Sequence, residues 1–125
     1  MRNIAFIGLG GFAGAITRYI LSGLMQKYNI QFPIGTLFVN VTGCFILSLL
    51  MTLSEYGYLS QETRLLICIG FLGSYTTMST FMFENLQLYI DNQYTWLIFN
   101  FFATSLLCLV GVIVGRIAAL RLVML

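Results

Sequence analysis

GFLGSYTTMSTFMFE, residues 70–84, interrupts an apolar run that would otherwise form a continuous membrane helix. Two glycines and five hydroxyl side chains lie near the middle of that run: Gly70, Gly73, Ser74, Thr76, Thr77, Ser79 and Thr80. Glycine loosens a helix, and serine or threonine can hydrogen-bond to the backbone in place of the helical ladder. Irregular backbone at membrane depth survives only where protein or a water-filled cavity satisfies it. The stretch therefore predicts a broken helix that handles something polar.

The composition of the whole chain indicates an integral membrane protein. Hydrophobic residues make up 59% of the 125 residues and charged residues only 8%, whereas about 25% charged residues is typical of soluble domains. A soluble chain of this length has too little interior to bury so much apolar surface. The net charge of +2 is too small to suggest nucleic-acid binding. The chain has no histidine, and no nucleophile–base pair or metal cluster is visible, so we do not expect an enzyme.

Four charge-poor runs are long enough to cross the hydrocarbon core, which takes about 20 apolar residues. We expect a single domain, residues 1–125, with membrane helices near 3–25, 33–54, 63–90 and 94–118. Four spans put both termini on one side, where the arginines are more numerous, and this favours a cytoplasmic location for the termini. The small number of charges leaves insertion in both orientations open.

Small and polar residues inside these runs predict contacts between helices. Two glycine pairs, Gly10 with Gly14 and Gly111 with Gly115, have the spacing that permits close helix packing. Arg18 either extends its charge to the headgroups or faces an anion in a vestibule. The three cysteines lie in separate runs without the spacing of a metal site, so we expect them to pack as small apolar residues without a disulfide: Cys44, Cys68 and Cys108.

Asn40 lies near the middle of the second expected helix, where its amide group needs hydrogen-bond partners. We favour a role in lining a polar path over an interhelical hydrogen bond, and both interpretations remain open. In the third helix, past the interruption, polar and aromatic side chains share one face at helical spacing: Thr77, Thr80, Phe81 and Glu84. The fourth helix carries a thin polar stripe: Asn100, Thr104 and Cys108.

Three motifs make the chain resemble the fluoride channels of the Fluc, or CrcB, family. The most specific is G-x-x-T-T-x-S-T-F-x-x-E, from Gly73 to Glu84. The supporting motifs are G-G-x-x-G-x-x-x-R-Y, from Gly10 to Tyr19, and G-T-L-x-V-N-x-x-G, from Gly35 to Gly43. The resemblance covers nearly the whole chain. It implies an antiparallel dual-topology homodimer with two pores, whose broken third helices cross near the membrane midplane and hold a structural Na⁺ ion.

The resemblance also implies a role for each candidate residue. The backbone carbonyls of Gly73 and Thr76 would bind Na⁺, and Arg18 and Glu84 would lie near the vestibules. The fluoride path would be lined by Asn40, Thr77, Met78, Ser79, Thr80, Phe81, Asn100 and Thr104. The family usually has phenylalanine where this chain has Met78, and a thioether lacks the electropositive ring edge that attracts an anion.

The expected function is that of a passive, fluoride-selective channel in a bacterial or archaeal plasma membrane, which lets fluoride leave the cell and lowers its toxicity. Its partners would be fluoride, the lipid bilayer, and a second antiparallel copy of itself or a paired homologue. One alternative is a proton-coupled exporter of the small multidrug type, which needs a carboxylate in the first helix; this first helix has none. Another is a non-transporting assembly subunit, which needs no ordered hydroxyl groups.

Overall fold

The computed structural model describes residues 1–28 and 31–125, and this part of the chain forms only helices and their connections. Residues 29 and 30, within the expected first connection, lie outside the described residues. Four helical stretches are long and apolar enough to cross a membrane. The elements are α1 (Arg2–Gln26), α2 (Ile34–Glu55), α3 (Gln61–Thr63), η1 (Arg64–Leu72), α4 (Gly73–Tyr75), α5 (Met78–Ile90) and α6 (Tyr94–Val123). The prediction of an all-α chain with four candidate membrane spans is confirmed.

The third span, Gln61–Ile90, is made of four consecutive elements, from α3 to α5. Its segment η1 has π-helical hydrogen bonding, which the sequence pattern did not predict. The fourth helix, α6, continues to Val123, beyond the expected end near residue 118. The other observed ends lie close to the expected ones.

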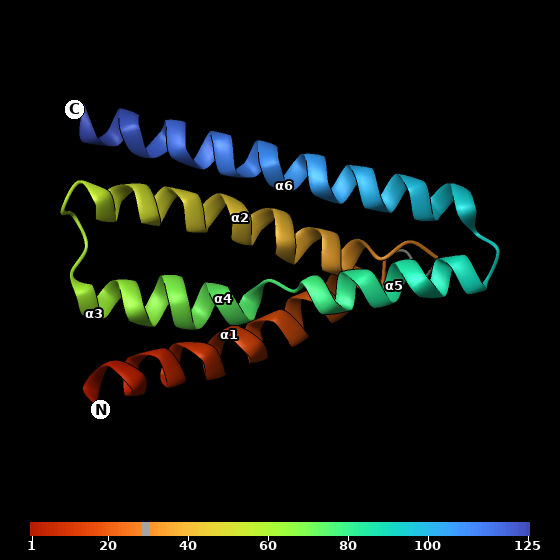
Figure 1. Cartoon of the computed structure of the whole chain (residues 1–125), viewed down its shortest axis with the longest axis horizontal. Helices are drawn as coiled ribbons and strands as arrows, with labels where there is room; N and C mark the ends of the chain where they lie inside the picture. The colour runs from red at the N-terminus through yellow and green to blue at the C-terminus, as the bar shows by residue number, and fades with distance from the viewer. Residues whose placement is uncertain (29–30) are drawn as a thin grey trace.

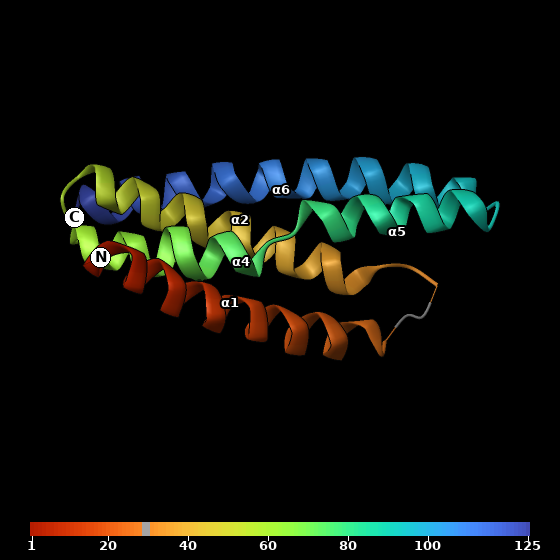
Figure 2. The same cartoon turned by 60° about the horizontal axis from the view of Figure 1, so that its bottom comes forward.

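Successive spans run in opposite directions, so both termini lie at the same end as the connection between α2 and α3 (Figure 1). α2 packs along α6 on one side and against α1 and η1 on the other. α1 packs on η1 and α4, whereas α5 packs mainly on α6 (Figure 2). The two halves of the third span therefore contact different neighbours, and the residues between α4 and α5 lie where the neighbour changes.

Glycine allows the helix backbones to approach closely at two contacts. A Cβ atom on Gly14 would overlap the carbonyl oxygen of Phe71 in η1, and one on Gly115 would overlap the carbonyl oxygen of Phe45 in α2. Backbone atoms cannot move aside as a flexible side chain can, so a larger residue would separate the helices. The glycine one turn earlier in each helix faces the same neighbouring backbone. The predicted packing role of both glycine pairs is confirmed.

The buried apolar core is small and lies beside the end of α4. It consists of Val39, Leu72 and Tyr75, while most of the large apolar side chains on α1, α5 and α6 point outward. In water, a protein with so much exposed apolar surface would aggregate, whereas in a membrane lipid or a second protein can cover that surface. The fold therefore suits a membrane environment.

Two ion pairs join helices at the end that holds the termini. Arg2 contacts Glu62 at 3.2 Å, which links α1 to α3. Arg116 contacts Glu55 at 3.4 Å, which links α6 to α2. Both pairs are exposed, and such pairs contribute at most about 1 kcal/mol each, so helix packing rather than charge holds the spans together.

Candidate functional site

Helical geometry stops for two residues between α4 and α5. Thr76 has φ −82° and ψ 156°, and Thr77 has φ −150° and ψ 120°, so both have extended backbone. The hydroxyl oxygen of Thr77 accepts the backbone N–H of Thr80 at 3.2 Å and caps the start of α5. The two threonines thus end one helix and begin the next. We call residues 76–77 the interruption.

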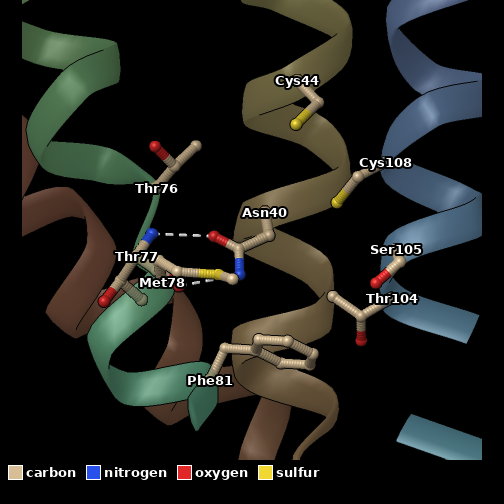
Figure 3. Close-up of a pocket in the computed structure, with 9 residues that line it drawn as sticks. All are labelled: Asn40, Cys44, Thr76, Thr77, Met78, Phe81, Thr104, Ser105 and Cys108. Carbon is tan, nitrogen blue, oxygen red and sulfur yellow. Dashed lines mark hydrogen bonds between the residues drawn. The ribbon is translucent and has the colours of Figure 1, made fainter. Parts of the chain in front are cut away.

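The side chain of Asn40 on α2 holds the interruption in place (Figure 3). Its Oδ1 atom accepts the backbone N–H of Thr77 at 2.7 Å, and its Nδ2 group donates to the carbonyl oxygen of the same residue at 3.0 Å. The amide group therefore pairs with both polar backbone groups of Thr77, as a neighbouring strand would. Asn40 is buried, so these bonds satisfy polar groups that have lost most of their contact with water. The interhelical hydrogen bond considered from the sequence is present.

The interruption takes the usual helical N–H donor away from at least two backbone carbonyl groups. In a continuous helix the N–H of Thr77 would bond to the Gly73 carbonyl, and the N–H of Thr80 to the Thr76 carbonyl. Here those N–H groups donate instead to the side-chain oxygens of Asn40 and Thr77. Free carbonyl oxygens are ligands that a hard cation such as Na⁺ accepts. The residues named for sodium thus fit such an ion, and the described residues contain no cluster of three or more His, Cys, Asp or Glu side chains.

Three hydroxyl groups gather at the start of α5. The Thr77 hydroxyl donates to the Thr80 Oγ1 atom at 3.0 Å, and it lies 3.3 Å from the Ser79 hydroxyl. Ser79 and Thr80 are exposed on the single chain, whereas Thr77 is buried. We call Thr77, Ser79 and Thr80 the hydroxyl cluster. It offers several rotatable O–H donors at one place.

A pocket of about 260 Å³ lies between α2, α6 and the interruption, and we call it the α6-side pocket. Four residues predicted for the fluoride path reach it from two helices and the interruption: Asn40, Thr77, Met78 and Phe81 (Figure 3). Thr104, a fifth predicted residue, lines it from α6. Phe81 is almost fully buried and stacks on Phe101, with 6.1 Å between ring centroids. Three lining residues had not been predicted as site residues: Cys44, Ser105 and Cys108.

A second pocket, of about 210 Å³, lies on the other side of the interruption between α1, α2 and α5. Arg18 lines this α1-side pocket together with Thr36, Thr77 and Thr80. Arg18, the charged residue within the first span, therefore lies beside the hydroxyl cluster. Thr77 lines both pockets, so the two adjoin at the interruption.

Glu84 lies farther along α5, toward the connection between α1 and α2. Its Oε1 atom accepts the hydroxyl of Thr36 at 2.6 Å, whereas its Oε2 atom is buried without a hydrogen-bond partner. Glu84 also lines a pocket of about 350 Å³ that contains Gln87, Asp91 and Gln93. Glu84 and Arg18 thus lie in separate pockets that both contact the third span.

Asn100 and Thr104, two residues of the predicted stripe of α6, belong to a hydrogen-bonded chain, and of the two only Thr104 also lines the α6-side pocket. Asn100 donates to the side-chain oxygen of Asn85 at 3.2 Å, and the Thr104 hydroxyl donates to Asn100 at 3.1 Å. Asn85 in turn donates to the Phe81 carbonyl at 2.8 Å. Asn85 was not among the residues predicted for the site. Its amide group in an apolar run, one turn after Phe81, was the signal that could have identified it. This chain fixes α5 against α6 next to the α6-side pocket.

Comparison with known proteins gives consistent matches along the chain. The family model "CrcB-like protein, Camphor Resistance (CrcB)" matches residues 5–116. A Methanosarcina acetivorans protein named fluoride-specific ion channel FluC 1 is 48% identical over 123 residues, 98% of this chain and 94% of the relative. A Methanococcus aeolicus protein named fluoride-specific ion channel FluC is 42% identical over 98% of this chain and 98% of the relative. A Shewanella sediminis protein of the same name is 39% identical over 93% of this chain and 94% of the relative. These matches include every residue that lines the two pockets.

The contact between Asn40 and Thr77 predicts a stability effect. Asn40→Asp replaces the Nδ2 donor by a carboxylate oxygen that faces the Thr77 carbonyl, so two acceptors would oppose each other in a buried site. We expect the free energy of unfolding to fall by roughly 3 kcal/mol, measured by SDS denaturation of the protein in micelles. Asn3→Asp, the same change at an exposed position on α1, is the control. Equal effects of the two substitutions would contradict a structural role for the Asn40 amide.

Proposed function

The chain belongs to the CrcB family, and because its matched members are named fluoride-specific ion channels, we propose that it is a fluoride channel. It lets fluoride leave the cytoplasm passively and so lowers the toxicity of the ion. The observation that carries this proposal, beside the family, is the set of hydrogen-bond donors around residues 76–77 in the middle of an apolar span. A multi-pass membrane protein with such an interruption has a route for a polar solute.

The donor groups suit a small and strongly hydrated anion. Fluoride must exchange its water for several donors that bind it without trapping it. The Asn40 amide has two N–H donors, and only one of them is used on the Thr77 carbonyl. The second N–H and the hydroxyl cluster are available to fluoride, and the edge of the Phe81 ring adds a weak electropositive contact. Asn40 would thus position the interruption and line the path.

We place the path through the two pockets on either side of the interruption. The α6-side pocket supplies Asn40, Met78, Phe81 and Thr104. The α1-side pocket supplies Arg18, whose positive charge would attract the anion to a vestibule. Glu84, bonded to Thr36, would also lie near a vestibule. Asn100 would contribute indirectly, since its amide is engaged with Asn85.

A second copy of the chain, in antiparallel orientation, would complete the channel. Gly73, Ser79 and Thr80 are polar or backbone-exposed positions on the surface of the single chain, and they lie in the middle of a 30-residue span. Lipid cannot satisfy polar groups at that depth, so another protein surface must cover them. Two antiparallel copies would bring their interruptions together near the bilayer midplane, as the broken third helices of the family resemblance imply. A paired homologue could take the place of the second copy.

Structural Na⁺ would lie where the two interruptions meet, held by the Gly73 and Thr76 carbonyls of both copies. The support is that both carbonyl groups lack their helical hydrogen bonds. A bound cation supplies a fixed positive charge, which lowers the cost of bringing an anion into the membrane. No other group in this part of the span carries a positive charge.

The proton-coupled exporter is the less suitable alternative. Its mechanism needs a carboxylate that binds and releases protons within the first span, and residues 2–26 contain none. The relatives matched here are named as channels. An assembly subunit without transport activity would not need the hydroxyl cluster or the free N–H of Asn40.

Fluoride release from liposomes tests the proposed function. Purified protein is reconstituted into vesicles loaded with potassium fluoride, and valinomycin carries potassium so that no charge accumulates. We expect rapid release, measured with a fluoride electrode, in the absence of a proton gradient. Vesicles loaded with potassium chloride should retain chloride. Release that requires a proton gradient would indicate the exporter, and no release at all would remove the transport function.

Two substitutions separate the roles of Phe81 and Met78 in this assay. Phe81→Ile removes the ring edge but keeps apolar bulk, so we expect the fluoride rate to fall about tenfold or more. Met78→Phe adds a ring without removing a donor, so the rate should stay near that of the unsubstituted protein. Phe102→Ile, at an exposed position away from both pockets, controls for loss of a phenyl ring. Equal, small effects at Phe81 and Phe102 would show that Phe81 only packs.

Removal of sodium tests the dimer and its ion together. In buffer where N-methyl-D-glucamine replaces Na⁺, we expect the dimer to dissociate, measured by single-molecule photobleaching of labelled protein in vesicles. Added Na⁺ should restore the dimer and Ca²⁺ should not, because the site offers no carboxylate. An unchanged fraction of dimers without sodium would contradict the sodium site. A single photobleaching step under all conditions would contradict the dimer.

A further inference from the structure

Three sulfur-containing side chains line the α6-side pocket. Cys44 reaches it from α2, Cys108 from α6 and Met78 from the start of α5 (Figure 3). Both cysteines are free and half-buried. From the sequence we expected them to pack as small apolar residues, but they face a pocket. Cys68, the third cysteine, is buried elsewhere in η1.

The arrangement brings two thiols from different helices together. The Cys44 and Cys108 side chains point into the same pocket from α2 and α6, two helices that pack along each other (Figure 3). The close contact of α2 with α6 at Gly115, two turns past Cys108, keeps the two helices at short range. The pocket has no carboxylate and no charged side chain among its lining residues. It therefore offers soft sulfur donors and little that would hold a hard cation.

We propose that Cys44, Cys108 and Met78 bind a soft monovalent d¹⁰ metal ion, copper(I) or silver(I). Thiolate and thioether ligands select such ions over hard cations. On binding, one of the two thiols gives its proton to water and forms a metal–thiolate bond. The other thiol and the thioether each donate a lone pair and keep their bonds. The complex carries no net charge, which an apolar site tolerates better than an isolated ion.

The bound ion would share its pocket with Asn40, Thr77, Phe81 and Thr104. It would fill space that fluoride needs and would so obstruct the path. Metal binding itself depends only on the sulfur atoms. Inhibition of transport rests, in addition, on the proposed function.

Silver(I) is the probe for the site. Its binding is measured by calorimetric titration of the reduced, full-length protein in chloride-free detergent buffer. We expect one ion per chain in the unsubstituted protein and in Cys68→Ala, which is the matched cysteine control. Cys44→Ala and Cys108→Ala should each abolish this binding, and Met78→Leu should weaken it at least about tenfold. Unchanged affinity in either Cys44→Ala or Cys108→Ala, or in Met78→Leu, would overturn the proposal.

Fluoride release from vesicles then tests the consequence of binding. Silver should block release through the unsubstituted protein and Cys68→Ala, but not through Cys44→Ala or Cys108→Ala. Release that continues while silver is bound would overturn the claim that the ion obstructs the path. Silver binding in a protein that never releases fluoride would instead reject the proposed function and leave the metal site standing.

Discussion

The pairing of Asn40 with the backbone of Thr77 is the contact on which the rest of the site depends. Helical hydrogen bonds are lost where the third span becomes extended, and an unsatisfied polar group costs several kcal/mol in hydrocarbon. Asn40 supplies an acceptor and a donor at 2.7 and 3.0 Å, so Thr77 keeps both of its bonds. The Thr77 side chain then starts α5 by capping the Thr80 amide. The interruption is thereby a defined structure rather than a frayed helix.

This contact explains why polar groups collect at one depth in an otherwise apolar chain. Two pockets meet at Thr77, one lined by Arg18 and the other by Phe81. The hydroxyl cluster adds donors beside them, and the freed carbonyls of residues 73 and 76 add acceptors. In the proposed channel the hydroxyl donors would bind the anion, and the carbonyl acceptors would bind the cation.

Much of this arrangement could be predicted from sequence, because it depends on local composition. The four spans follow from charge-poor runs, and the interruption is located by the hydroxyl residues that come after two glycines in the third run. What the sequence could not provide depends on contacts between helices. The bonds from Asn100 to Asn85 and the meeting of Cys44 with Cys108 join residues from different spans. The π-helical geometry of η1 is rare and has no signature in residue type.

The central claim is that Asn40 holds residues 76 and 77 in an extended conformation within the membrane. Solid-state NMR of the protein in lipid bilayers tests it directly, because the backbone ¹³C chemical shifts of Thr76 and Thr77 report their torsion angles. We expect extended shifts in the unsubstituted protein, and shifts closer to helical values in Asn40→Ala. Extended shifts that are unchanged in Asn40→Ala, or helical shifts in the unsubstituted protein, would contradict it.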